Sequence, residues 1–244
     1  MAGRPPAEVR PDESHTSGAM GKICEVWVAD LAHWGDWHVE ALLDDAERSR
    51  ARALRQPDDR LRFMAGVSLL KRAVARTTGR TAVSVMIDRR CATCGGPHGR
   101  PRVVGSGVQV SVAHSGARVM VALTEAGPVG VDVEVRAGDR ASAVARYFLA
   151  EDEPVDQVDD VLTYWCRKES VVKATGEGLR APLREVVVSP ASAPARLMRY
   201  RGRVLAAQMV DLVVGDGYAA AVTVLTAAEV AVKVSPAGAL VTTA

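Results

Sequence analysis

The sequence has little of several features that would each narrow its function. Aromatic residues make up only 4% of the 244 residues, so valine, leucine and alanine must fill the core. Neither sign of charge dominates, because 31 basic residues stand against 29 acidic ones and give a formal net charge of +2. A protein that coats nucleic acid generally carries a strong basic excess, so we predict no nucleic-acid partner.

Long apolar segments are also missing. No uncharged apolar run approaches the roughly 18 residues that a membrane span needs, so we predict no membrane partner. Residues 1–20 are polar and lack the apolar centre of a signal peptide. We expect them to form a disordered tail, with Met20 as an alternative start, and we expect a cytoplasmic protein. Cysteine is scarce, and Cys91 and Cys94 are the one close pair among the four, which agrees with a reducing compartment.

Hydrophobic patterning predicts two halves that each combine helices with strands. The chain is 48% hydrophobic and 25% charged, which suffices to bury a core. The expected elements of the first half are a strand over 23–29, helices over 39–55 and 57–78, and a strand pair over 108–113 and 119–124. Those of the second half are a strand over 129–135, helices over 141–149 and 160–175, and strands over 184–189, 203–214, 218–226 and 230–234. We predict an α+β fold, a pseudo-two-fold pair of similar α+β subdomains over 21–127 and 128–244.

The segment Gly130-Val131-Asp132-Val133-Glu134 is the strongest local signal for chemistry. Because side chains alternate along a strand, Asp132 and Glu134 share one face and the valines share the other, which should face a core. Two such carboxylates repel each other unless a cation lies between them, and Gly130 would leave room for a ligand. Carboxylate oxygens suit Mg²⁺, which also binds phosphate oxygens. The alternative is an edge strand with a solvated acidic face.

The helix predicted over 160–175 carries a second signal. Trp165, Glu169 and Lys173 are spaced by four and therefore share one stripe. If the apolar part of this stripe docks the helix, Glu169 and Lys173 reach into a cleft, where Glu169 would complete a three-carboxylate metal site and Lys173 would meet phosphate. The alternative is an ordinary surface pair of Glu169 and Lys173.

The loop before the strand pair carries a third signal. Arg100 lies between Gly99 and Pro101, a setting that suits the rim of a phosphate or nucleotide site. His114 ends a predicted strand and could donate to a phosphate, although a structural role is the alternative.

The cysteine pair invites a zinc interpretation together with His98. Structural zinc usually takes four ligands, and no second CxxC or paired histidine lies near Cys91 and Cys94. We therefore expect a reduced loop without zinc.

Taken together, these residues resemble the 4'-phosphopantetheinyl transferase superfamily, of the Sfp type. The resemblance rests on motifs that occur in family order from about residue 24 to 189. They are Arg62-Phe63, Gly99-Arg100-Pro101, His114-Ser115, Gly130-Val131-Asp132-Val133-Glu134, Arg146-Tyr147-Phe148 and the helix segment Trp165-Cys166-Arg167-Lys168-Glu169-Ser170-Val171-Val172-Lys173.

The resemblance implies an activity, a cofactor and site residues. The enzyme would move the phosphopantetheine arm of coenzyme A onto a serine of an apo acyl or peptidyl carrier protein, acting as a monomer with its active site between the two subdomains. Asp132, Glu134 and Glu169 would hold Mg²⁺, and Glu169, Lys173 and Asp132 would be the catalytic residues. The residues expected to contact coenzyme A are Arg62, Gly99, Arg100, Pro101, Ala113, His114 and Lys173.

The chain departs from the family pattern at Val67, where many relatives have an arginine expected near coenzyme A. The candidate replacements are Arg48, Arg50, Arg60, Arg62 and Lys71. Two other functions fit the same residues. One is a Mg²⁺-dependent phosphohydrolase that uses the acidic cluster on water, and the other is a binding module in which Cys91, Cys94 and His98 hold zinc and an arginine-rich helix meets nucleic acid.

Overall fold

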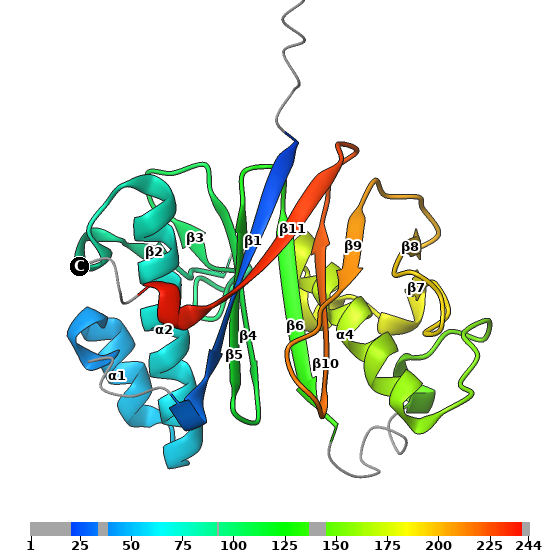
Figure 1. The fold of residues 1–244 in the computed structure, drawn as a ribbon, viewed down its shortest axis with the longest axis horizontal. Helices are drawn as coiled ribbons and strands as arrows, with labels where there is room; N and C mark the ends of the chain where they lie inside the picture. The colour runs from blue at the N-terminus through cyan, green and yellow to red at the C-terminus, as the bar shows by residue number, and fades with distance from the viewer. Residues whose placement is uncertain (1–20, 34–38, 92, 137–144, 241–244) are drawn as a thin grey trace, which may run out of the picture.

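The computed structural model describes residues 21–33, 39–91, 93–136 and 145–240, and it forms four layers in the order helix, sheet, sheet, helix (Figure 1). The first sheet has the strand order β11-β1-β5-β4-β3-β2, and the second has the order β6-β10-β9. Strands β7 and β8 form a separate antiparallel pair. The α+β class predicted from the sequence is therefore confirmed.

The first half begins with β1 (Lys22–Asp30) and continues through α1 (Asp45–Ala53) and α2 (Pro57–Thr78). Strands β2 (Ile87–Asp88), β3 (Arg102–Val103), β4 (Gln109–Ser115) and β5 (Arg118–Thr124) complete it. The helix predicted over 39–55 is interrupted, since a 3-10 turn over Val39–Leu42 precedes α1 and Asp44 caps α1 by accepting from the backbone N–H of Glu47 at 2.8 Å. Proline at the first position and Gly79 in the left-handed conformation delimit α2 as the sequence predicts.

The second half contains β6 (Val129–Val135), α4 (Val158–Thr175), β7 (Val186–Val188) and β8 (Leu197–Tyr200). It continues through β9 (Gln208–Asp211) and β10 (Tyr218–Val224) to β11 (Val230–Pro236). The strand predicted over 203–214 is reduced to β9, and β8 has no counterpart in the sequence prediction. Of the helix predicted over 141–149, residues 145–148 are helical and 141–144 lie outside the described residues.

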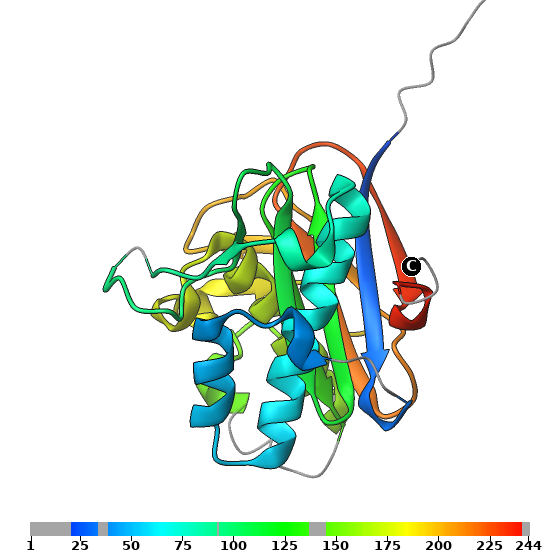
Figure 2. The ribbon, with the colours of Figure 1, turned by 90° about the vertical axis from the view of Figure 1, so that its left-hand side faces the viewer.

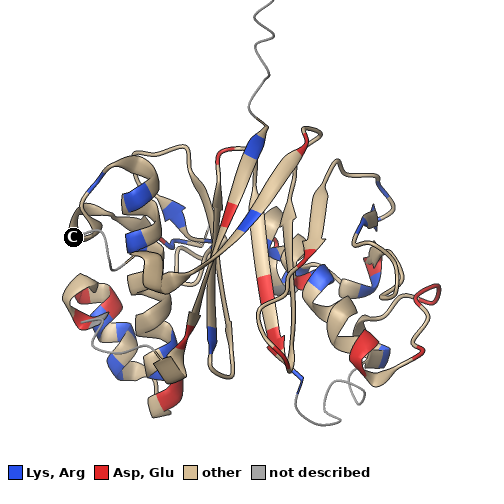
Figure 3. Ribbon diagram, viewed as in Figure 1, with Lys and Arg blue, Asp and Glu red and all other residues tan. Residues whose placement is uncertain are grey.

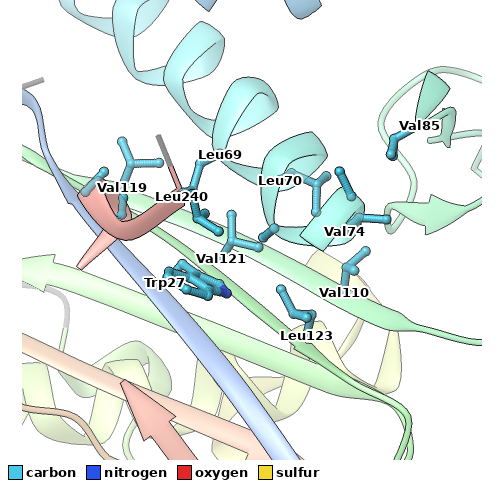
Figure 4. Close-up of a cluster of buried hydrophobic side chains, with 14 of the residues drawn as sticks. Trp27, Leu69, Leu70, Val74, Val85, Val110, Val119, Val121, Leu123 and Leu240 are labelled. Atoms are coloured by element: carbon cyan, nitrogen blue, oxygen red, sulfur yellow. The ribbon is translucent and has the colours of Figure 1, made fainter. Parts of the chain in front are cut away.

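Each long helix packs on one sheet. In the first half, α2 covers the sheet through Leu69, Leu70 and Val74, which contact the strands around Trp27 and Val121 (Figures 2 and 4). Valine and leucine fill this core, as the scarcity of aromatic residues predicts. In the second half, α4 lies across β6 and β10 (Figure 1).

The two sheets meet face to face at a second core. The valines of β6 face it as predicted, with Val129, Val131 and Val133 at most 1% exposed, whereas Val135 at the strand end is 36% exposed and does not. Side chains also bridge the sheets, because Ser111 and Ser115 on β4 accept from the backbone N–H groups of Val131 and Val135, each at 3.1 Å.

The last strand crosses back to the first half. Strand β11 pairs in parallel with β1, from Lys22 beside Val230 to Val28 beside Pro236. That the chain divides into two subdomains between residues 127 and 128 stays a prediction. In the structure, β11 from the second half adds a strand to the sheet of the first half.

Candidate active site

The acidic face of β6 lies beneath helix α4. At Gly130, a Cβ atom would come within 1.9 Å of the Ser170 carbonyl oxygen and 2.5 Å of the Ala174 nitrogen. The space predicted for a ligand at Gly130 is therefore filled by the helix backbone, and that prediction is wrong. Glycine is needed there because α4 crosses β6 so closely, and this crossing brings Lys173 onto Asp132.

Lys173 binds Asp132 rather than reaching outward. Its Nζ donates to the Asp132 Oδ1 at 2.6 Å and to the Val131 carbonyl oxygen at 3.0 Å. Asp132 is only 6% exposed, and its second oxygen, Oδ2, is buried without a hydrogen-bond partner. A buried carboxylate oxygen without a partner is costly. The donor near Asp132 is the buried Cys166 thiol, a weak donor whose pKa is raised by burial and then by the charge of Asp132.

Two further carboxylates lie near this pair. Ser115 Oγ donates to Glu134 Oε2 at 2.7 Å. Burial raises the pKa of Glu134, and the negative charge of Asp132 raises it further, while the Ser115 hydrogen bond opposes the shift. The pKa of Glu169 is raised by burial, then by Asp132, with Lys173 opposing and Glu134 adding to the shift. The three predicted metal ligands therefore share one electrostatic site with a single lysine.

This donor set fits a divalent cation. Asp132, Glu134 and Glu169 offer the hard oxygen ligands that Mg²⁺ takes. Their oxygens do not all lie within 4.8 Å of one another, because Asp, Glu, His and Cys side chains in the described part of the chain form such a group only at Cys91, Cys94 and His98. Acidic positions lie along β6, while Lys, Arg, Asp and Glu are otherwise interspersed over the face in view (Figure 3).

A cavity of about 700 Å³ lies beside this cluster, between the two halves. One wall comes from the loop between β2 and β3 and from Ser111 and Val112 of β4. The opposite wall comes from the end of α4 and the turn after it, with Val172, Lys173, Gly176, Glu177, Gly178 and Arg180. Lys173 therefore connects the carboxylates to the cavity.

The predicted nucleotide loop lines this cavity with Gly99, Arg100 and Pro101. Arg100 donates to the Ala174 carbonyl oxygen at 3.0 Å and to Gln109 Oε1 at 3.1 Å, so it ties the loop to the end of α4. Gly99 closes the loop at its base, where a Cβ would come within 2.5 Å of the Arg90 carbonyl oxygen. Partial burial, followed by the charge of Arg102, lowers the pKa of Arg100.

The other residues predicted to contact coenzyme A lie outside the lining of this cavity. Ala113 is 4% exposed and packs in the core between the sheets. Arg62 donates to Asp59 at 2.8 Å and to the Gly116 carbonyl oxygen at 3.1 Å. His114 is solvent-exposed, yet partial desolvation of its ring and then the charges of Lys173 and Arg62 lower its pKa. The coenzyme A contacts of these residues stay predictions.

Val67 lies in a small apolar cluster between α1 and α2. Val67 is 2% exposed and packs with Leu43 and Ala51. Of the five proposed substitutes, Arg50 lines a second cavity, of about 620 Å³. Sequence reasoning missed Arg89, which lines both cavities and has a buried Nε without a partner. The residues around Arg89 in the sequence do not indicate its role, because its burial depends on how the loop after it folds back.

Sequence reasoning also missed two cations inside α4. The side chains of Arg167 and Lys168 are both fully buried. Arg167 pairs with Asp211 and caps backbone carbonyls of the loop after β7. Lys168 pairs with Glu153 at 2.5 Å and donates to the carbonyl oxygens of Phe148 and Leu183. Both cations therefore fix α4, and with it Glu169 and Lys173, in the second half.

The loop between β2 and β3 holds a cluster of soft ligands. Cys91, Cys94 and His98 place their ligand atoms within 4.8 Å of one another, and theirs is the only group of three or more His, Cys, Asp or Glu so close among the described residues searched. The backbone N–H groups of Cys94 and Thr93 hydrogen-bond the Cys91 sulfur and lower its pKa to about 7. The sequence predicts a loop without a metal site, whereas the structure brings three potential zinc ligands together in this loop.

Comparisons of the sequence with known proteins point to one superfamily. The sequence model of the 4'-phosphopantetheinyl transferase superfamily matches residues 128–223, which include the three carboxylates and Lys173. The chain is 29% identical over 194 residues to the 4'-phosphopantetheinyl transferase HetI of Nostoc sp., a match that covers 75% of this chain and 79% of the relative.

Two other relatives match shorter segments. The chain is 28% identical over 161 residues to a putative 4'-phosphopantetheinyl transferase, slr0495, of Synechocystis sp., covering 61% of this chain and 63% of that protein. It is 24% identical over 151 residues to the 4'-phosphopantetheinyl transferase of Bacillus subtilis, covering 59% of this chain and 64% of the relative. The matched segments thus span less than two thirds of these two relatives.

In this fold two helix-covered sheets pack together, and an acidic strand of the second sheet lies under a Lys-bearing helix. Over residues 128–223 the chain matches the 4'-phosphopantetheinyl transferase superfamily, and the three relatives above carry that enzyme's name. Within the described residues, no helix is long and apolar enough to cross a membrane.

Proposed function

We propose that the protein transfers the 4'-phosphopantetheine arm of coenzyme A to a serine of an apo carrier protein and releases adenosine 3',5'-bisphosphate, as an Sfp-type enzyme. The observation that carries the proposal is the junction at Lys173. This lysine lines the cavity between the halves and at the same time binds Asp132 of the carboxylate cluster. A site for a charged phosphate ester therefore adjoins a site for a cation.

The cavity suits a nucleotide with several phosphates. Arg89, Arg100, Lys173 and Arg180 supply positive charge to its lining, and Arg89 retains an N–H without a protein partner. Arginine pairs well with phosphate because its planar group donates two parallel hydrogen bonds. The one acidic group in the lining, Glu177, is held by Arg201 at 3.1 Å.

Asp132, Glu134 and Glu169 would hold Mg²⁺, which fits their oxygen donors. Bound there, the ion supplies neutralisation of the charge on a pyrophosphate. Lys173 stabilises the bisphosphate as it leaves, because negative charge accumulates on that group in the transition state.

Glu169 is the carboxylate best suited to take the proton from the acceptor serine. Burial and then the charge of Asp132 raise the pKa of Glu169 in the metal-free chain, and a bound cation would oppose that shift. Glu169 remains partly exposed at the edge of α4, whereas Asp132 is buried against Lys173.

The names of the relatives support the same reaction, since all three are called 4'-phosphopantetheinyl transferases. We propose a cytoplasmic location, where coenzyme A is available and the four free cysteines stay reduced. We also propose that the enzyme acts as a monomer, because the cavity and the carboxylate cluster are both built from one chain.

One incubation tests the proposal. The full chain is mixed with coenzyme A, Mg²⁺ and an apo carrier protein, and both protein and small-molecule products are followed by mass spectrometry. Transfer adds the mass of the phosphopantetheine arm to the carrier and none to a carrier whose acceptor serine is alanine. Release of free 4'-phosphopantetheine with an unmodified carrier would instead show the phosphohydrolase, which uses the same acidic cluster on water.

A further inference from the structure

The loop between β2 and β3 folds into a compact turn that gathers its two cysteines. Cys91 donates its backbone N–H to the Gly96 carbonyl oxygen at 2.8 Å and accepts from the Gly95 N–H at 2.8 Å. Gly95 has a φ of +73°, a conformation that favours glycine and lets the chain reverse directly after Cys94. The turn thus brings the Cys91 and Cys94 sulfurs to the same side.

His98 returns to this turn from the other end of the loop. Its Nε2 lies 2.9 Å from the Cys94 sulfur, and its backbone N–H donates to the Gly96 carbonyl oxygen at 3.0 Å. At Gly96 a Cβ would come within 3.2 Å of the His98 ring and 3.4 Å of the Cys94 sulfur, so glycine makes room for the ring. The backbone of the loop is therefore arranged around the meeting of these three side chains.

Burial does not explain why this segment is ordered. None of the described residues from 91 to 98 is buried, so the loop gains little hydrophobic stabilisation against the entropy of fixing its backbone. A metal bound by three side chains of the loop would therefore add stability that burial does not supply. The two sulfurs and the imidazole are the donors that Zn²⁺ prefers.

We propose that Cys91, Cys94 and His98 bind one Zn²⁺. Three protein ligands leave the fourth tetrahedral position open, as in zinc sites that take water or an external ligand. All three residues line the cavity of about 700 Å³ between the halves, so the open position faces the space that also contains Arg100 and Lys173. This assignment depends only on the three side chains and not on the proposed transferase activity.

A bound zinc would also affect that cavity, and this part of the inference rests on the proposed function. Thr93 Oγ1 accepts from Arg180 at 2.7 Å, and the Pro97 carbonyl oxygen accepts from Arg50 at 2.6 Å. The loop therefore spans from α1 to the turn after α4 and carries Arg100 at its end (Figure 2). Zinc that closes the loop would hold Arg100 and Arg180 in place for the nucleotide, and its removal should raise the KM for coenzyme A more than it lowers kcat.

The test measures metal on the full chain. Wild-type protein is dialysed against Zn²⁺, passed through a desalting column and analysed for zinc by mass spectrometry. The expected result is one zinc per chain in the wild type and a loss of that zinc in the double variant Cys91→Ser with Cys94→Ser and in His98→Ala. Cys24→Ala and His33→Ala are the matched controls, because Cys24 is buried in β1 and His33 lies on the surface beside Asp30. Both controls should keep the full zinc content.

Cobalt replaces zinc as a second readout that requires no variant. Co²⁺ added to chelator-stripped wild type should give a thiolate-to-cobalt charge-transfer band, which Zn²⁺ then abolishes. A background zinc content with no such band, or zinc that persists in the double variant, would overturn the proposal. Loss of two free thiols with no metal bound would show a Cys91–Cys94 disulfide instead and would equally overturn it. Bound zinc in a protein that transfers no phosphopantetheine would leave the zinc site standing and remove the proposed function.

Discussion

The long helices of the two halves, α2 and α4, each bury a lysine that holds the preceding segment. Lys71 on α2 pairs with Glu47 at 2.7 Å, and Lys168 on α4 pairs with Glu153 at 2.5 Å. In both pairs the side chains are less than 10% exposed, and each lysine also donates to backbone carbonyl oxygens. These buried charges are fully compensated by the protein itself.

Lys173, little more than one turn beyond Lys168, forms a pair of another kind. Its partner Asp132 keeps one buried oxygen without a hydrogen-bond partner, and Glu134 and Glu169 add negative charge nearby. The comparison shows how the same helix can serve structure and chemistry. Lys71 and Lys168 fix the fold, whereas the unpartnered oxygen of Asp132, beside two further carboxylates, leaves room for a cation at Lys173.

The largest effect is expected from breaking the compensated pair on α4. Lys168→Met leaves Glu153 as a buried, unpaired carboxylate, which typically costs about 3–5 kcal/mol of unfolding free energy. Urea denaturation followed by tryptophan fluorescence measures the loss. The double variant Lys168→Met with Glu153→Leu is the control and should recover much of it. Wild-type stability in the single variant would contradict a structural role for Lys168.

Breaking the pair of Lys173 and Asp132 should lower turnover, and it should also cost stability because Asp132 is buried. Lys173→Ala removes a positioned cation from the leaving bisphosphate, which typically costs about 10²–10³ in kcat. The KM for coenzyme A should rise less, and Lys173→Arg should restore only part of the rate because a planar fork does not replace a compact ammonium group. Steady-state kinetics with an apo carrier protein decide the matter, and unchanged turnover would remove Lys173 from the proposed site.

The two halves also differ in how closely a glycine approaches the backbone of a neighbouring element. Gly130→Ala places a methyl group against the backbone of α4 and should cost about 1–3 kcal/mol, the usual cost of overpacking, while shifting Lys173. Gly66→Ala on α2 is the matched control, since its nearest neighbour is the Val112 side chain at 3.3 Å, which can adjust. Alanine also favours a helix there, by up to about 1 kcal/mol. Thermal unfolding of both variants tests the contrast, and equal losses would contradict it.

The smallest expected effect is a pH dependence without Mg²⁺. The pKa of Glu169 is raised in the fold above its ordinary 4.5, so the folded chain holds this proton more tightly than the unfolded chain. Between the ordinary and the raised pKa, stability therefore falls as pH rises and is regained as pH falls. Glu169→Gln should weaken this pH dependence, and at pH values above the raised pKa its melting temperature should be higher than that of the wild type.

Melting temperatures measured in EDTA across the acidic and neutral range check this prediction. Added Mg²⁺ should raise the melting temperature of the wild type more than that of Glu169→Gln, because the ion binds the folded site. Superimposable profiles of the two proteins in EDTA would show that neither burial nor the neighbouring carboxylates raise the pKa of Glu169 in the fold.

Local patterns in the sequence determined most of the elements. The alternation in 129–135 predicted β6 over its full length, and the cap signals at Pro57 and Gly79 delimited α2. The order of motifs also indicated the superfamily. These features depend on residues that are close to one another in the sequence, so the sequence alone reveals them.

Only the tertiary structure decided how these elements serve one another. It showed that Gly130 admits a helix rather than a ligand, that β11 returns to β1, and that Arg167 and Lys168 are interior cations. It also brought His98 to the cysteine pair and left Asp132 with a spare oxygen. Each of these facts concerns a partner distant in sequence or a contact set by close packing, and hydrophobic periodicity carries no information about such partners.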